Sequence, residues 1–309
     1  MGTFIEVVLQ AGRSAVELAL FTLLPIMVVM MILLRFLEAN GILGRIVAVL
    51  TPLARPFGLT GMAVLAMLQI TFVSFVAPLP TLALMEREGT SERHLAAPLA
   101  AVLAMAPANA PFPLAAFGLQ AGPVLVISAL GGILAATTTF WFFGRRLSRE
   151  TRPIPVAPRQ DKAKPSLLKT INTGGGEAVQ IVLNIIPMLL LSLAVVIGLE
   201  RAGAVAWLAL AIGPMLSAIG IDASVILPAL TKFLAGSTAY LGVVTEMVKQ
   251  GRFSVGLLNE SAGFLLHPLD LPGVAILISA GPRVAYGLLP AIAGGALGIA
   301  FRALATNLM

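Results

Sequence analysis

Four ionisable residues stand within apolar sequence in the C-terminal half of the chain: Lys232, Glu260, His267 and Asp270. Such side chains are costly inside a bilayer and usually face a cavity or one another, so they are our candidates for ion or proton coupling. Lys232 could extend its amine to an interface, or pair with Asp270 or Glu260 across a site, which we favour. Glu260 could equally cap a helix at the interface, and His267 could be a structural hydrogen-bonding residue rather than a proton relay.

Neutral polar residues gather where apolar runs are interrupted, and they are our candidates for substrate binding. The ends of broken helices leave N–H and C=O groups without partners, which a small polar ligand or an ion would satisfy. The alternative is that these side chains cap their own backbone. The candidates are Ser74, Asn109, Ser237, Thr238, Tyr240 and Asn259.

Several kinds of chemistry are not expected. The chain has no cysteine, which removes disulfides, thiolate metal sites and cysteine nucleophiles. No Ser-His-Asp or metal-ligand spacing stands out, so we expect neither an enzyme nor a cofactor. Gly174, Gly175 and Gly176 are interpreted as a flexible hinge, because no Lys-Ser/Thr pair follows them as in a phosphate-binding loop.

Composition points to a membrane protein. Hydrophobic residues make up 58% of the 309 residues and charged residues 11%, against about 25% charged in a soluble domain. Segment 145–172 holds eight Lys and Arg residues but only Glu150 and Asp161, so it supplies the whole formal net charge of +6. The basic balance therefore belongs to one loop, and no nucleic-acid partner is expected.

Apolar runs of spanning length occupy residues 15–37, 123–143, 178–199 and 285–305, which predicts an all-α, polytopic integral membrane protein. Basic residues concentrate in the loop 145–173, and this favours a cytoplasmic location for it. The same rule assigns a smaller set of basic residues to the opposite side: Arg13, Arg201, Lys249, Arg252 and Arg302.

The chain also repeats itself at an offset of 162 residues. Proline, glycine and glutamate match across it: Pro25 with Pro187, Glu38 with Glu200, Gly41 with Gly203, Pro52 with Pro214, Gly58 with Gly220 and Gly89 with Gly251. We infer two homologous repeats, 1–144 and 174–309, joined by the linker 145–173. Such repeats commonly build a transporter with its site between them, and the charge distribution permits inverted halves.

Each repeat has the same order of parts. A spanning helix is followed by a short segment expected at the interface (42–58 and 204–220), then by a third segment (62–85 and 223–247). The third segment could be one helix or a re-entrant hairpin. A run that breaks at 105–113 or at 267–273 follows, and then a last span. Irregular backbone at membrane depth is tolerated only where it is buried in protein or lines a wet cavity, so the breaks predict a site.

The stretches GLTGMAVLAMLQITFVSFVAPLP and LTKFLAGSTAYLGVVTEM, with LLNESAGFLLHPLDLPG, resemble the nucleoside-recognition, or Gate, family. That family includes concentrative nucleoside transporters, the membrane part of FeoB-type iron transporters and spore-maturation proteins A and B. The resemblance implies inverted repeats with scaffold helices, interfacial helices and re-entrant hairpins. The glutamates at both hairpin tips of the nucleoside transporters are absent here, at positions 74–78 and 236–238.

The function implied by this resemblance is transport of a small polar, nucleoside-like solute across the inner membrane. Alternating access coupled to H⁺ or Na⁺ would be the mechanism. The expected partners are the solute and the lipid bilayer, and a homo-oligomer remains open. The alternative is a non-transporting membrane subunit of a spore-maturation-like complex.

Overall fold

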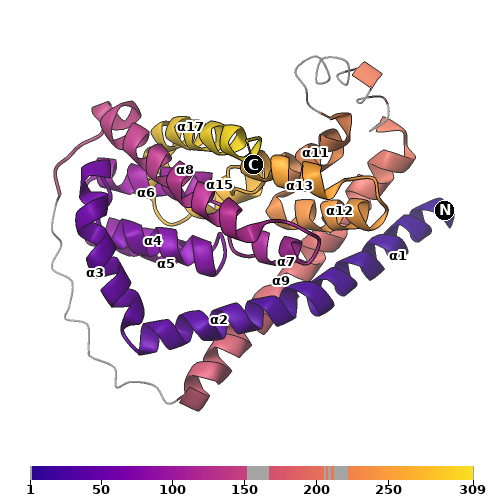
Figure 1. Cartoon of the computed structure of the whole chain (residues 1–309), viewed down its shortest axis with the longest axis horizontal. Coiled ribbons are helices and arrows are strands. Elements are labelled where there is room, and N and C mark those ends of the chain that lie inside the picture. Colours follow the sequence, from indigo (N-terminus) through magenta and orange to yellow (C-terminus); the bar gives the residue numbers. More distant parts are fainter. Residues whose placement is uncertain (1, 152–166, 205–206, 208–209, 212–221, 309) are drawn as a thin grey trace.

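The computed structural model describes residues 2–151, 167–204, 207, 210–211 and 222–308, and within these residues it contains helices and no strand. Figure 1 shows a long N-terminal helix along one edge, a bundle of α4, α6, α8 and α17, and a second group of α11, α12 and α13. The buried apolar residues form two clusters. One joins α12 and α14 to α1, α2 and α9, and the other joins α4, α6, α8 and α17. The predicted all-helical class is confirmed.

The N-terminal helix and α9 (Leu167–Arg201) form a scaffold. The former consists of α1 (Gly2–Glu17), a π-helical segment (Leu18–Leu23) and α2 (Leu24–Ala39). Arg35 on α2 pairs with Glu177 on α9 at 2.6 Å. A Cβ built on Gly174 would lie 3.2 Å from the backbone of Ile32, so the glycine permits a close helix crossing. The prediction of a flexible hinge at Gly174–Gly176 is therefore wrong, because these residues lie inside α9. The boundary predicted between the linker and the second repeat, at residues 173 and 174, also falls within this helix.

The first segment expected at the interface forms α3 (Ile42–Ala54) and a 3₁₀ turn (Arg55–Phe57). Residues 42–57 bend by 76° from the end of α2, so α3 leaves the direction of the scaffold helix. The corresponding segment 204–220 and most of the linker 145–173 lie outside the described residues.

Both third segments turn back on themselves. In the first half α4 (Gly61–Phe72) and α5 (Leu79–Arg87) are separated by residues 73–78, and the Thr81 hydroxyl donates to Gln69 Oε1 at 2.7 Å across the pair. In the second half a 3₁₀ turn (Ala223–Val225) leads into α11 (Ile226–Ala235), which is followed by α12 (Ser237–Lys249). Each segment is thus a helical hairpin within the fold.

The predicted breaks are confirmed as interruptions of helix. After α6 (Glu92–Ala104) the chain is irregular until α7 (Pro111–Ala115). In the second half α13 (Val255–Glu260) and α14 (Ala262–Leu265) end before an extended stretch, and helix resumes in α15 (Leu271–Ile278) and α16 (Pro282–Tyr286). Pro107 and Pro268 fall in these stretches, where the ring cannot continue the helical hydrogen bonding, and Pro111 begins α7.

Among the residues that the structure describes, two helices are long and apolar enough to cross a membrane: α8 (Ala121–Trp141) with its 3₁₀ extension (Phe143–Arg146), and α17 (Leu288–Thr306). The bent pair Met27–Leu37 and Ile42–Phe57 would make a third if it were one span. The predicted spans 15–37 and 178–199 lie in the N-terminal helix and in α9. Each half therefore ends in one long apolar helix.

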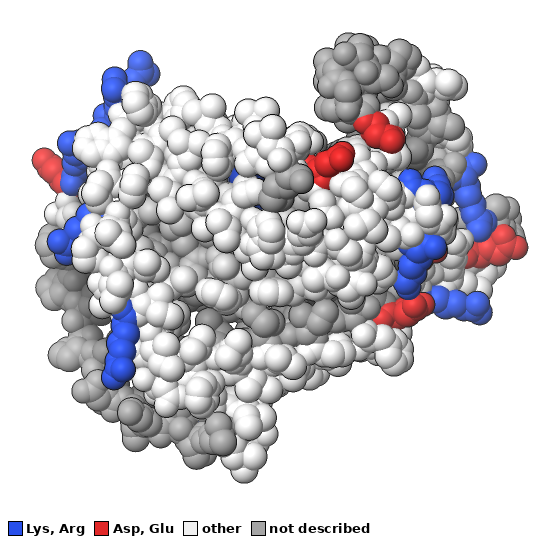
Figure 2. Space-filling model, in the orientation of Figure 1, with Lys and Arg blue, Asp and Glu red and all other residues white. Residues whose placement is uncertain are grey.

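Charged side chains lie mainly at the two ends of the molecule. Figure 2 shows mostly Lys and Arg at the end where α3 lies and α8 finishes, both signs at the opposite end, and a largely uncharged face between them. At the second end Lys249 pairs with Glu17 at 3.0 Å and Arg201 with Glu6 at 3.3 Å. A low-charge belt between two charged ends fits a protein embedded in a bilayer.

Backbone conformation also recurs at the repeat offset. Gly41 and Gly203 have φ of 69° and 74°, and Gly89 and Gly251 have φ of 75° and 69°. Helices α2, α5, α9 and α12 therefore finish in a similar way at matching positions.

Candidate functional site

The second hairpin turns at a single residue, Gly236. Its φ of 90° favours glycine, and a Cβ there would lie 3.3 Å from Pro272 Cγ. The Gly236 N–H donates to the Lys232 carbonyl and closes α11, while the Gly236 carbonyl accepts from the Tyr240 N–H and begins α12. This glycine places the start of α12 against the extended stretch between α14 and α15.

Lys232 and Asp270 form a buried ion pair beside that turn. Their side chains are 0% and 2% exposed, and Lys232 Nζ donates to Asp270 Oδ2. Asp270 Oδ1 accepts from the Gly273 N–H at 2.7 Å and so caps α15. Ser237 Oγ lies 3.4 Å from Asp270 Oδ2 and donates to the His267 carbonyl at 3.2 Å. Of the two pairings predicted for Lys232, the one with Asp270 is thus present, and Ser237 joins it.

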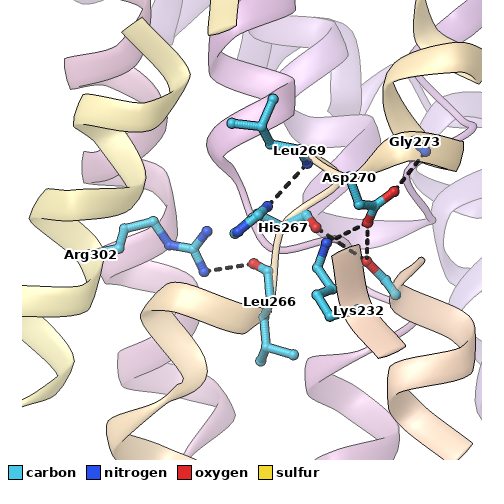
Figure 3. Close-up of polar contacts among 8 residues, drawn as sticks. Lys232, Leu266, His267, Leu269, Asp270, Gly273 and Arg302 are labelled. Atoms are coloured by element: carbon cyan, nitrogen blue, oxygen red, sulfur yellow. Dashed lines mark hydrogen bonds and ion pairs between the residues drawn. The ribbon is translucent and has the colours of Figure 1, made fainter. Parts of the chain in front are cut away.

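His267 lies in the stretch that carries Asp270. Figure 3 shows residues 266–270 running between Arg302 on one side and Lys232 on the other. His267 Nδ1 accepts from the Leu269 N–H at 3.0 Å, so the neutral ring carries its proton on Nε2. The residue is buried, and within the described part of the chain Nε2 has no hydrogen-bond partner.

Two more candidates keep an unpaired polar atom in the interior. Asn109 Oδ1, in the break after α6, and the Tyr240 hydroxyl, on α12, are buried and have no partner among the described residues. The break around Asn109 is anchored through its backbone: Ser128 Oγ accepts from the Ala106 N–H at 2.6 Å, and the Ile70 carbonyl accepts from the Ala108 N–H at 2.9 Å. Buried unpaired polar groups are rare, so these atoms are available to a ligand.

The remaining candidates do not join the cluster around Asp270. Ser74 is buried in the turn of the first hairpin and Thr238 is partly buried in the first turn of α12. Asn259 ties the halves together, since its amide accepts from the Gln120 N–H at 2.7 Å and donates to the Gly118 carbonyl at 3.1 Å. The pairing considered for Glu260 with Lys232 is wrong, because Glu260 ends α13 with an exposed side chain.

Arg302 was assigned from the sequence to the surface opposite the linker, and this is wrong. It is fully buried on α17, and its guanidinium donates to the Ala104 carbonyl and, at 2.8 Å, to the Leu266 carbonyl. An arginine inside the apolar run 285–305 was the available signal, because a cation at that depth needs internal acceptors.

A cavity of about 370 Å³ lies apart from the cluster, between α1, α9 and the second hairpin. None of the predicted site residues lines it. Its polar lining residues are Gln10, Ser14, Arg201, Glu246, Gln250 and Arg252, and Leu227 and Val243 contribute apolar surface from α11 and α12.

Electrostatic shifts outside the spanning helices are found at the start of α6 and before α11. Burial lowers the pKa of His94, and the positive charges of Arg149 and Arg93 lower it further. The pKa of Asp222 is lowered because its carboxylate accepts from the Ser224 N–H at 2.8 Å. Neither group belongs to the cluster around Asp270. No group of three or more His, Cys, Asp or Glu that could hold a metal ion occurs among the residues that the structure describes.

The sequence model of the Gate family, described as nucleoside recognition, matches residues 20–119. This segment reaches from the π-helical segment to Leu119, between α7 and α8, and it includes Ser74 and Asn109. No curated protein sequence matches the chain.

Solved structures of CNTnw, a concentrative nucleoside transporter, are similar over nearly the whole chain. An inward-facing, substrate-bound structure gives a TM-score of 0.70 at 17% identity over 99% of this chain and 83% of that chain. A double variant in an outward-facing state gives 0.68 at 18% identity over 93% and 75%. A variant in an intermediate state gives 0.68 at 19% identity over 93% and 74%.

The protein therefore has the fold of a membrane transporter of the concentrative nucleoside transporter type. The resemblance to the Gate nucleoside-recognition family that the sequence predicts is confirmed over residues 20–119. The comparisons do not favour the alternative of a non-transporting subunit.

Proposed function

We propose that the protein is an inner-membrane transporter of a small, neutral, nucleoside-like solute. The observation that carries this proposal is the buried polar cluster of Lys232, Ser237, His267 and Asp270, where a hairpin turn meets a broken helix. Polar groups concentrated at interrupted helices within a transporter fold are typical of a solute site.

The charges of the cluster favour an uncharged solute. Lys232 and Asp270 neutralise each other, and a neutral His267 ring would offer an Nε2–H donor that has no partner among the described residues. Tyr240 and Asn109 supply further unpaired polar atoms. Hydroxyl, carbonyl and ring-nitrogen groups of a nucleoside could pair with such donors and acceptors, whereas a phosphate would need an unpaired cation.

Solute access would require the second hairpin to move relative to the scaffold. The cavity between α1, α9 and the hairpin lies between these two parts and is lined by both polar and apolar side chains. We infer that the hairpins α4–α5 and α11–α12 are re-entrant, that the repeats are inverted, and that the linker is cytoplasmic. The recurring glycine conformations and the basic end of the molecule support these inferences. Lys232, His267 and Asp270 are the residues that would couple transport to H⁺ or Na⁺.

Ligand-dependent thermal stability of the purified protein in detergent tests the proposal. Nucleosides and nucleobases would be added one at a time, with nucleoside monophosphates for comparison. A ligand that binds only the folded state at 100 times its Kd stabilises it by about 2.7 kcal/mol. We expect a nucleoside to raise the unfolding temperature, and the same nucleoside to enter proteoliposomes that contain the protein.

The variants Ser237→Ala and Asn109→Ala should weaken this shift. Ser279→Ala is the matched control, because its hydroxyl is exposed and donates only to the Ile276 carbonyl at 2.6 Å. A shift with monophosphates but not with nucleosides would contradict the assignment of a neutral solute. Neither a shift nor uptake with any nucleoside or base would overturn the proposed function.

A further inference from the structure

Arg302 is a buried cation without a carboxylate partner among the described residues. It lies on α17, a helix of membrane-spanning length, and its side chain is completely inaccessible to solvent. An arginine keeps its charge in essentially every protein environment. Its charge must therefore be stabilised by the backbone groups around it.

Those groups are carbonyls at the broken helices of both halves. Ala104, the last residue of α6, accepts from Nη1. Leu266, which follows α14, accepts from Nη2 at 2.8 Å, and Ala262, the first residue of α14, lies 3.4 Å from the same nitrogen. The carbonyls of Ala104 and Leu266 lie at the C-terminal ends of α6 and α14, where they lack intrahelical donors and carry partial negative charge. The Ala262 carbonyl also accepts from the Leu266 N–H at 3.1 Å, and the three oxygens together form an environment that favours a cation.

Neighbouring backbone is shaped to admit the arginine. A Cβ on Gly131 of α8 would lie 2.5 Å from Arg302 Cγ and 2.6 Å from Cδ, and a Cβ on Gly263 would lie 2.3 Å from the Arg302 carbonyl oxygen. Helices α8 and α14 thus approach the arginine at positions without side chains. The guanidinium is enclosed by fixed elements of the core.

We propose that the carbonyls of Ala104, Ala262 and Leu266 form a monovalent-cation site, which Arg302 fills as a cation tethered to the chain. The guanidinium links the break of the first half to that of the second, and its charge stabilises these carbonyls as a bound cation would. Removing it leaves a site for a free monovalent cation, with guanidinium preferred over alkali-metal ions because it restores the N–H donors. This site is separate from the transported solute and does not depend on its identity.

Chemical rescue of Arg302→Ala tests this proposal. Thermal unfolding of the full-length variant in detergent would be measured with millimolar guanidinium, methylguanidinium, Na⁺ or K⁺, with N-methyl-D-glucamine replacing them at constant ionic strength. We expect the variant to unfold at a lower temperature than the wild type, and guanidinium to recover at least half of the difference at saturation. The wild type should not respond. The proposal is overturned if no cation exceeds N-methyl-D-glucamine, or if the wild type rises by the same amount.

Two further pairs of variants keep the test decisive if Arg302→Ala does not fold. Arg302→Lys keeps the charge and Arg302→Gln removes it, so the lysine variant should unfold at the higher temperature, and equal midpoints would overturn the proposal. Gly131→Ala should lower the midpoint by displacing the arginine stem. Gly122→Ala is its control on the same helix, because a Cβ at Gly122 meets no atom within 4 Å. Equal midpoints for these two variants would also count against the site.

Discussion

Replacing Asp270 with asparagine should expose how strongly the buried ion pair holds the second hairpin against the broken helix. Lys232 is 0% exposed and Asp270 is 2% exposed in their side chains, so either residue alone would be a buried uncompensated charge. Removing one partner of such a pair costs about 3–5 kcal/mol. Asparagine can still accept from the Gly273 N–H and cap α15, so the loss in Asp270→Asn reports the charge rather than the cap.

The double variant provides the sharper measurement. Lys232→Met leaves Asp270 with its hydrogen bonds from Ser237 and the Gly273 N–H, so we expect a loss of about 3 kcal/mol. Lys232→Met with Asp270→Asn leaves no buried charge at this position, and the loss should be about 0–2 kcal/mol. The coupling energy between the two residues should therefore be at least about 4 kcal/mol.

Equilibrium unfolding in detergent micelles, followed by the circular dichroism of the helices, would supply these free energies. The exposed pair of Lys249 and Glu17, with side-chain exposures of 45% and 65%, is the matched control. Lys249→Met should cost only about 0–1 kcal/mol. If the double variant loses the sum of the two single losses, the pair is not coupled and the reasoning is refuted.

Three further predictions follow from other parts of the structure. Burial and neighbouring arginines keep the folded-state pKa of His94 low, so acid favours the unfolded state, and the stability of the protein should fall as the pH drops through the unfolded pKa of about 6.5. In thermal unfolding measured at several pH values, His94→Gln should weaken this pH dependence. An unchanged dependence of the unfolding temperature on pH would contradict the prediction. Ser128→Ala leaves the buried Ala106 N–H unpaired and should lower the free energy of unfolding by about 1–3 kcal/mol, measured by chemical denaturation. A loss below about 0.5 kcal/mol would be too small for a lost hydrogen-bond acceptor and would contradict this prediction. The chain has no cysteine, so single cysteines can be placed at Arg55 and Arg87, before and after the first hairpin. Both should react with a membrane-impermeant maleimide from the same side of the membrane. Labelling from opposite sides would mean that the segment between them crosses the membrane.

Much of the fold can be predicted because its signals are local. Runs such as 123–143 and 285–305 require helices, since only internal hydrogen bonding satisfies the backbone in lipid. Pro107, Pro268 and Gly236 interrupt helices by steric rules that act within a few residues, and the predicted breaks are present. The helical class followed from these patterns, whereas the relationship to the Gate family came from the resemblance of whole stretches of sequence.

The candidate site was only partly predictable. The pairing of Lys232 with Asp270 could be favoured because two opposite charges in apolar sequence need each other. Glu260 has the same charge as Asp270 and a similar apolar neighbourhood in the sequence, yet its side chain is exposed at the end of α13. Side-chain direction at a helix end depends on packing that sequence spacing does not contain.

By itself, the sequence determined that this protein is a helical membrane protein with interrupted helices, and it predicted two similar halves. Hydrophobicity and backbone stereochemistry act over short distances and are visible in the order of residues. Only the tertiary structure decided that Arg302 crosses between the two halves, that Gly174 lies at a helix crossing, and that Asn109 and His267 keep unpaired polar atoms. Those properties depend on which distant carbonyls and side chains meet when the helices pack.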